Sequence, residues 1–189
     1  MVEFNPQSEP PQRWGWNDLQ QVDPLEVRAL QSFLNEGQPA PQAGFALVLP
    51  ERLRAQMIEH AGRWVVHEQA GILLGRAYRD PQGFVFTVLA AALPVEDAEA
   101  SIAQVKMRAA SWPSIWRGLL QNPGQEMIGW YHSHPGYGIF LSATDRITQN
   151  AYFAAPWQIA VVMDPVRGEL GAFAGDNPDP LPDAAILSV

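Results

Sequence analysis

Cysteine is absent from this chain of 189 residues, and basic residues are scarce. Without a thiol there is no disulfide framework and no cysteine nucleophile, which excludes cysteine-dependent proteases. Lysine and arginine together number 12 against 20 aspartates and glutamates, so the formal net charge is −8 at pH 7. A chain of this charge has no basic stripe to neutralise phosphates, and we therefore expect no nucleic-acid partner.

Long apolar runs are missing as well. No stretch approaches the roughly eighteen apolar residues of a membrane-spanning helix, and the N-terminus has neither the basic nor the apolar part of a signal peptide. The chain also lacks a glycine-rich phosphate loop and an internal repeat. We therefore expect a cytoplasmic protein with no membrane contact, and a hydrophobic content of 47% is sufficient for one well-buried domain.

What the sequence does contain is a short segment with the spacing of metal ligands. Two of the four histidines, His132 and His134, follow the apolar run 127–131 and precede Pro135 and Gly136. Residues i and i+2 of an extended chain face the same side, so both imidazoles can reach one ion. Proline and glycine then end the strand and turn the chain.

A third ligand is predicted from the start of a helix. The sequence from Ser142 to Asp145 has the S/T-x-x-D/E form of a capping box, and Ile147 and Tyr152 continue the helical pattern. A capping box would point the Asp145 carboxylate back toward the strand end. Two imidazoles and one carboxylate suit zinc and leave the fourth tetrahedral position open, as in catalytic sites.

A zinc hydrolase also needs a group that moves protons, and the histidine segment has no further carboxylate to offer. The candidate is Glu68, which leads directly into an apolar strand containing Gly71 and Gly75. Taken alone, this window favours a solvated glutamate at the edge of a strand. The pattern formed with the histidine segment changes that interpretation.

Together these positions resemble the JAMM (MPN+) metalloprotease motif. The sequence around the histidines, Gly-Trp-Tyr-His-Ser-His-Pro-Gly-Tyr-Gly, is similar in particular to the deubiquitinating subunits of the proteasome lid and the signalosome. The compact size favours a prokaryotic member of a ubiquitin-like modification pathway. The motif residues are, in order, Glu68, Gly71, Gly75, His132, His134, Pro135, Ser142 and Asp145.

The resemblance implies roles for five of these residues. His132, His134 and Asp145 would bind one catalytic zinc ion, Glu68 would act as general base and acid, and Ser142 would donate to the oxyanion. The implied enzyme is a zinc-dependent isopeptidase that removes a ubiquitin-like modifier from conjugates or precursors. Its substrate would be a ubiquitin-like protein or its conjugate, and some members of the family need a partner subunit.

Two other functions remain open. A zinc amidase acting on a small molecule, a sulfur-carrier adduct or a short peptide would use the same chemistry in a smaller pocket. A noncatalytic scaffold would be expected to have lost metal ligands, whereas all three are present here. For a protein substrate, the groove is expected beside residues 136–140 and the loop around residues 92–104.

The order of the expected elements indicates an α/β or α+β fold, and the resemblance implies a curved mixed sheet flanked by helices. Residues 1–42 are expected to form an N-terminal arm with an added helix that begins at Asp23-Pro24. Residues 43–175 would be the catalytic domain, and residues 176–189 an acidic, proline-rich tail. The tail is expected to be solvated over residues 176–183 and to fray over its last six residues.

Within that domain, strands and helices are predicted from apolar periodicity and turn residues. A helix over residues 103–121 is expected to be interrupted near Pro113, and the spacing of Trp112 and Trp116 predicts core residues. His60 is expected near a helix end. The remaining predicted elements are strands at 45–49, 84–89, 158–163 and 169–173 and a helix at 50–61.

Overall fold

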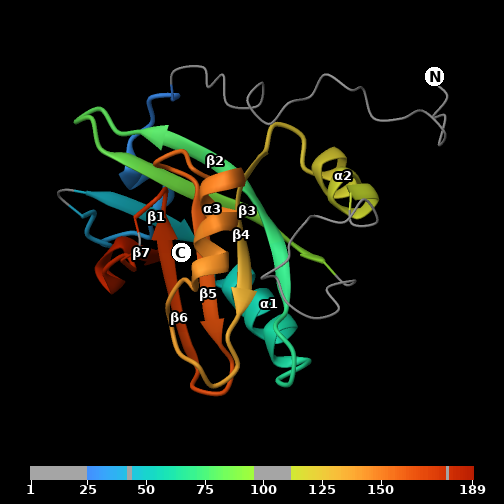
Figure 1. Cartoon of the computed structure of the whole chain (residues 1–189). Helices are drawn as coiled ribbons and strands as arrows, with labels where there is room; N and C mark the ends of the chain where they lie inside the picture. The colour runs from blue at the N-terminus through green and yellow to red at the C-terminus, as the bar shows by residue number, and fades with distance from the viewer. Residues whose placement is uncertain (1–24, 42–43, 96–111, 178) are drawn as a thin grey trace, which may run out of the picture.

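A computed structural model describes residues 25–41, 44–95, 112–177 and 179–189. They form a mixed seven-stranded sheet in the order β6-β5-β4-β2-β3-β1-β7, flanked by helices (Figure 1). The strands are β1 (Phe45–Leu49), β2 (Ala70–Arg79), β3 (Val85–Val95), β4 (Glu126–Ser133), β5 (Ile159–Asp164), β6 (Glu169–Ala174) and β7 (Ile186–Ser188). The helices are α1 (Glu51–Gly62), α2 (Trp112–Gln121), α3 (Ala143–Tyr152) and the short 3-10 helices η1 (Leu30–Phe33) and η4 (Asp183–Ala185).

Strand pairing confirms the expected mixed sheet. β2 is antiparallel to β3 and β4, whereas β4 and β5 are parallel to each other. The register of β2 shifts twice. Ala90 of β3 is the extra residue opposite Leu74 and Gly75, and Ile128 of β4 is the extra residue opposite Leu73 and Leu74. Such bulges bend a strand and increase its twist, and β2 and β3 curve across the molecule in Figure 1. In the described part of the chain, no helix has the length and apolar character needed to cross a bilayer.

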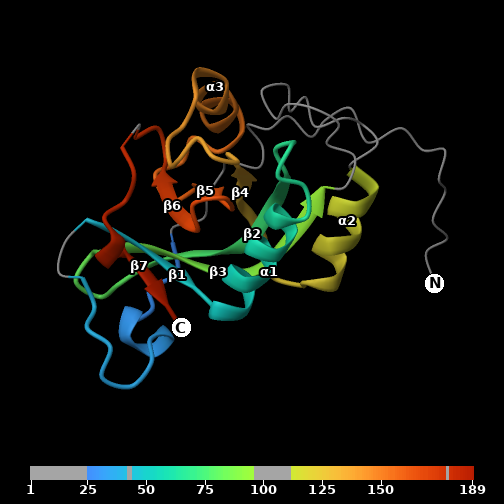
Figure 2. The same ribbon diagram turned by 90° about the horizontal axis from the view of Figure 1, so that it is seen from below.

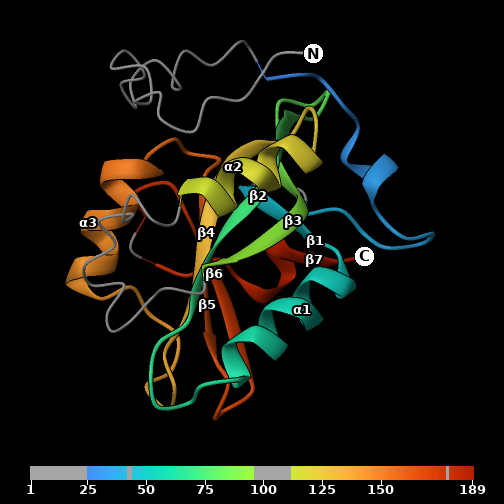
Figure 3. The ribbon, with the colours of Figure 1, turned by 90° about the vertical axis from the view of Figure 1, so that its right-hand side faces the viewer.

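Helices cover both faces of the sheet (Figures 2 and 3). α1 lies against one face and buries the predicted stripe of Leu53, Met57 and Ala61 completely. Each of the two larger side chains contributes roughly 1.5–3 kcal/mol by leaving water. On the opposite face, α2 contributes Ile115 to a cluster that contains Trp130 of β4. The sheet is therefore buried on both sides, which explains the nearly continuous apolar sequences of its central strands.

Two glycines of the motif lie where no side chain fits. A Cβ atom at Gly71 would overlap the ring of Tyr131 and the carbonyl oxygen of Leu93, and one at Gly75 would overlap the carbonyl oxygen of Val88. Both glycines are in β2, between its two antiparallel neighbours. They allow close approach of the strands that bring the proposed catalytic residues together.

Replacing Gly71 by alanine is therefore expected to lower the free energy of unfolding by about 1–3 kcal/mol, because backbone and an aromatic ring must both move. Urea unfolding followed by circular dichroism measures this change. Gly62→Ala is the matched control, since a Cβ at Gly62 would meet nothing within 4 Å. Equal effects of the two substitutions would show that close packing at Gly71 is not what excludes a side chain.

The predicted N-terminal α-helix is wrong in its described part. Leu30–Phe33 form only a 3-10 turn, and Val27 makes a parallel bridge with Arg79. β2 pairs with β4 only as far as Gly75, so the last residues of β2 present a free edge to which this segment attaches. The predicted start of the helix, at residues 23–24, lies outside the described residues.

The expected fraying of the last residues is also wrong. Ile186–Ser188 form strand β7, which pairs in parallel with β1. The side chain of Leu187 is buried. The amide of Glu51 donates to the carbonyl oxygen of Val189 at 2.9 Å. The acidic, proline-rich sequence before residue 183 gives no sign of this strand, which covers the edge that β1 would otherwise expose.

The predicted helix over residues 103–121 is described only from Trp112 onward, because residues 96–111 lie outside the described ranges. From Trp112 to Gln121 it forms α2, which continues through Pro113 without a break. Trp116 is 53% exposed, so its prediction as a core residue is wrong, whereas Ile115 is 1% exposed. Gly118 lies on the buried face of α2, close to β3, where a Cβ would overlap the side chain of Leu93.

Candidate metal centre

Strand β4 delivers both histidines to one end of the sheet. His132 lies within the strand and His134 just beyond it, where its backbone N–H donates to the carbonyl oxygen of Met163 at 2.7 Å. This bond keeps the chain extended past the end of β4. The two imidazoles therefore share a face, as predicted, and their Nε2 atoms are 3.2 Å apart. Their side chains are 0% and 3% exposed.

Helix α3 delivers the carboxylate through the predicted capping box. The Ser142 hydroxyl oxygen accepts from the backbone N–H of Asp145 at 3.2 Å, and the Ser142 N–H donates to Asp145 Oδ2 at 2.7 Å. The same Oδ2 atom lies 3.5 Å from Nε2 of His132 and 3.5 Å from Nε2 of His134. The cap thus fixes the rotamer that points the carboxylate at the strand end.

These three atoms fit one zinc ion. Ligands about 2.0–2.1 Å from a tetrahedral zinc lie about 3.3–3.4 Å from one another. The observed triangle has sides of 3.2, 3.5 and 3.5 Å. His132, His134 and Asp145 therefore have the donor types and the spacing of three zinc ligands, and a fourth position of the tetrahedron stays open.

Electrostatics favours the protonation states that bind a cation. Burial lowers the pKa of His132 against the opposing effect of Asp145, so this imidazole is neutral at pH 7. Burial would raise the pKa of Asp145, but hydrogen bonds from His132 and His134 outweigh it and lower the pKa. At His134 burial is outweighed by Asp145 and Glu68, which raise the pKa, so protons compete with a metal there as the pH falls.

Aromatic rings orient the two imidazoles. Trp130 stacks on His132 with ring centroids 4.3 Å apart and an interplanar angle of 11°. Phe140 lies against His134 with a centroid distance of 4.5 Å. Neither Nδ1 atom has a hydrogen-bond partner among the described residues. Packing against these aromatic rings therefore helps to orient both imidazoles.

The register of β2 and β4 brings Glu68 to the same place. Glu68 immediately precedes β2, as predicted, and its neighbour Gln69 accepts from Ser133 N–H at 2.9 Å and donates to the Ser133 hydroxyl at 2.8 Å. This antiparallel pairing places Glu68 opposite His134, with Oε1 3.8 Å from Nε2. The Glu68 side chain is 32% exposed, so it faces both the metal centre and solvent. His67 is exposed and does not join the ligands.

Gln149 supports the centre, although it was not predicted. Its side-chain oxygen accepts from the Trp130 indole N–H at 2.8 Å, and its NH₂ group donates to the carbonyl oxygens of Phe153 at 2.8 Å and Gly175 at 3.1 Å. Gln149 lies one turn after Asp145 on α3. It thereby connects the helix of one ligand to the indole that stacks on another. Its position four residues after Asp145 on the same helix could have indicated a supporting role. Its hydrogen-bond partners Trp130 and Gly175, however, lie in other segments of the sequence.

Substituting Gln149 by leucine is expected to lower the free energy of unfolding by about 2 kcal/mol or more. The substitution leaves a buried indole N–H and buried carbonyl groups without a partner, each at a cost of about 1–3 kcal/mol. Thermal or urea unfolding measures the loss. Gln56→Leu is the control, because the exposed Gln56 makes one bond of 3.0 Å to Ala92. A loss no larger than the control's would contradict the bridging role.

Curated relatives are similar to this chain over part of its length. COP9 signalosome complex subunit 5 from Caenorhabditis elegans is 36% identical over 128 residues, which cover 62% of this chain and 33% of that protein. Subunit 5a from Arabidopsis thaliana is 37% identical over 131 residues, with coverages of 62% and 34%. The chain thus spans about a third of the length of these curated relatives.

The fold and the family follow from two further comparisons. The solution structure of a protein from Desulfitobacterium hafniense matches with a TM-score of 0.55 and 21% identity, over 76% of this chain and 92% of that one, which shows a shared fold. The family model described as prokaryotic homologs of the JAB domain matches residues 50–170, more than half of the chain. With its buried His-His-Asp group, this chain belongs to the JAB (JAMM/MPN) domain family.

Proposed function

We propose that this protein is a zinc-dependent isopeptidase or peptidase that removes a ubiquitin-like modifier from conjugates or precursors. The observation that carries the proposal is the convergence of the ligand atoms of His132, His134 and Asp145, with the Glu68 carboxylate 3.8 Å from His134 Nε2. The similarity to subunit 5 of the COP9 signalosome supports the choice of substrate class. It also supports a partner subunit, which we include in the proposal.

The residues around the centre have the properties that amide hydrolysis needs. A zinc ion held by His132, His134 and Asp145 would supply a Lewis acid that polarises a carbonyl and makes water acidic near neutral pH. Glu68, partly open to solvent, accepts a proton from the attacking water and delivers it to the leaving amine. The cap uses a lone pair of the Ser142 oxygen, so the hydroxyl proton stays available to donate to an oxyanion.

Exposed apolar side chains around the centre favour a protein substrate over a small one. The α1–β2 loop, the β4–α3 loop and the β5–β6 turn gather at the same end of the sheet in Figures 1 and 3. Clustered exposed apolar residues of this kind mark protein interaction sites. The exposed large apolar residues of these three segments are Trp64, Val65, Val66, Tyr137, Phe140 and Val166.

The test is intact-mass analysis of fusions in which a ubiquitin-like domain ending in Gly-Gly precedes a reporter protein. Zinc-loaded protein is expected to cleave after the terminal glycine, and a chelator is expected to stop the reaction. Cleavage of short acylated peptides or small amides without cleavage of any fusion would instead support the small-substrate amidase. Absence of both activities in the zinc-loaded protein would contradict a hydrolytic role.

A further inference from the structure

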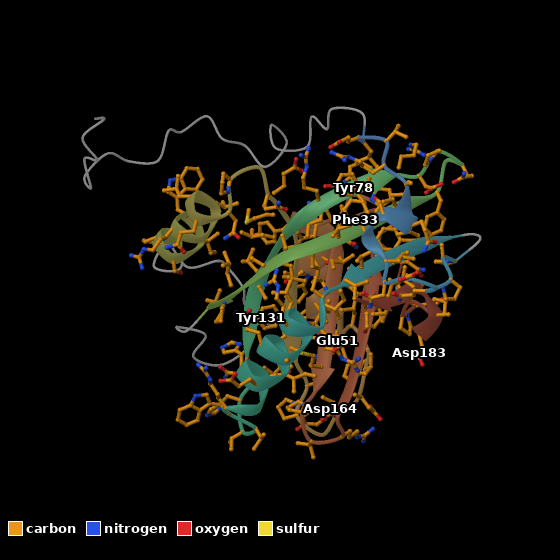
Figure 4. All side chains as sticks on the ribbon, turned by 180° about the vertical axis from the view of Figure 1, so that it is seen from behind. Phe33, Glu51, Tyr78, Tyr131, Asp164 and Asp183 are labelled. Carbon is orange, nitrogen blue, oxygen red and sulfur yellow. The ribbon has the colours of Figure 1, made fainter. Side chains whose placement is uncertain are left out.

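Asp164, labelled in Figure 4, is a buried carboxylate at the end of β5. Because β5 is parallel to β4, this is the end of the sheet at which His132 and His134 lie. The Asp164 side chain is 0% exposed, and its one ion-pair partner among the described residues, Arg167, is 53% exposed at a distance of 3.5 Å. Four backbone N–H groups satisfy the carboxylate instead. Oδ1 accepts from Gly136 at 2.9 Å, Val166 at 2.9 Å and Arg167 at 3.1 Å, and Oδ2 accepts from Gly138 at 2.8 Å. Burial would raise the pKa of Asp164, but these four donors outweigh it and hold the pKa below its ordinary value.

Two of the four donors belong to the segment that follows His134. Gly136 and Gly138 have φ values of 82° and 84°, a conformation that residues with side chains rarely adopt. Their N–H groups both point at Asp164, so one carboxylate fixes the shape of the segment. Between them Tyr137 is 73% exposed, and Phe140, which lies against the His134 ring, is 43% exposed.

We propose that Asp164 is a positioning residue that holds residues 136–140 as a rigid rim on which Tyr137 and Phe140 contact the substrate. This inference rests on the proposed function and adds the element that governs substrate affinity. A preformed rim avoids the loss of side-chain and loop freedom that binding would otherwise require. Asp164 therefore acts on the Michaelis constant through the two aromatic residues, without touching the reacting groups.

The backbone of His134 and the Asp145 carboxylate are held independently of Asp164, and only the His134 ring contacts this segment, at Phe140. His134 is fixed by its backbone bond to Met163, and Asp145 is fixed by the capping box with Ser142. Loosening the turn at residues 136–138, where Asp164 is bonded, is therefore expected to leave the zinc stoichiometry and kcat nearly unchanged. This separation distinguishes a rim from general support of the metal centre.

Asp164→Asn is the sharpest variant because it keeps the shape of the side chain. The amide oxygen can retain the three bonds made by Oδ1, but the NH₂ group then faces the N–H of Gly138, and two donors cannot bond. The matched control is Asp80→Asn. Asp80 directly follows the last residue of β2, at the end of this strand that lies away from the metal centre. Asp80 also accepts from a neighbouring and a distant backbone N–H, those of Gln82 at 3.0 Å and Leu30 at 2.8 Å.

Two measurements on the zinc-loaded full chain test the proposal. The first is amide hydrogen exchange, in which Asp164→Asn is expected to speed exchange at residues 136–138 by about 10- to 100-fold, the worth of a hydrogen bond to a charged group. The second is the kinetics of cleavage of the ubiquitin-like Gly-Gly fusion. We expect KM to rise about 3- to 10-fold, the cost of ordering one or two side chains, with kcat and zinc content unchanged. Asp80→Asn is expected to leave both the exchange rate at residues 136–138 and KM unchanged.

Three results would overturn the proposal. They are unchanged exchange at residues 136–138, a KM equal to that of Asp80→Asn, and a loss of zinc and kcat at constant KM. Tyr137→Ala provides a second variant that leaves the carboxylate and its four donors intact, and it too is expected to raise KM without lowering kcat. If no fusion is cleaved by the wild-type protein, the proposed function fails, whereas hydrogen exchange still decides whether Asp164 holds the segment.

Discussion

Replacing Glu68 by glutamine is expected to remove nearly all amide cleavage while zinc stays bound. Glutamine has the size and shape of glutamate but cannot accept the proton of the attacking water. Loss of a general base typically lowers the rate by about 10²- to 10⁴-fold. Glu68 is not one of the three proposed ligands, and its Oε1 lies 3.8 Å from His134 Nε2. The zinc content should therefore match that of the wild type.

The control for this substitution is Glu59→Gln. Glu59 lies on α1 with a side chain that is 73% exposed and pairs with Arg63 at 3.1 Å. The same loss of charge at this position is expected to leave kcat/KM unchanged. Measurement of kcat/KM on the Gly-Gly fusion together with zinc content decides the matter. If Glu68→Gln kept half of the wild-type activity, Glu68 would not be the general base. If the variant lost zinc, Glu68 would be a metal ligand.

Zinc is expected to stabilise the folded protein strongly, and this effect should depend on Asp145. A ligand that binds only the native state adds about 4 kcal/mol to the free energy of unfolding at a concentration of 1,000 times its dissociation constant. The native state holds the three ligand atoms within 3.5 Å of one another, which the unfolded chain does not. Chelation should accordingly lower the unfolding temperature of the wild-type protein.

Asp145→Asn is the informative variant for this prediction. The asparagine oxygen can still accept the Ser142 N–H that caps α3, so the helix start is preserved, but the anionic ligand is lost. In differential scanning calorimetry, zinc and chelator are expected to change the unfolding temperature of this variant far less than that of the wild type. An equal response of both proteins would place the stabilising zinc elsewhere in the chain.

The convergence of His132, His134 and Asp145 was predictable from sequence because these residues come from local patterns. The spacing of His132 and His134 follows from strand geometry, and the position of Asp145 follows from the capping box that begins with Ser142. Strand β1 and the buried stripe of α1 were likewise predicted from periodicity. Those predictions depend on neighbours within a few residues, and the structure confirms the elements.

Long-range contacts were not predictable in the same way. The approach of Glu68 to His134 depends on the register between β2 and β4, which family resemblance implied but no local pattern specified. The bonds of Gln149 and Asp164 join segments that are distant in the sequence, and β7 forms because β1 has an open edge. Trp116 was misassigned because helical spacing identifies a face of a helix but not which face is buried.

Anomalous diffraction at the zinc absorption edge, from crystals of the zinc-loaded protein, tests the central claim most directly. The account predicts one strong peak bonded to Nε2 of His132, Nε2 of His134 and an oxygen of Asp145, each about 2.0–2.2 Å away. No peak there, or a peak bound by other residues, would contradict the assignment of this site as a catalytic zinc centre.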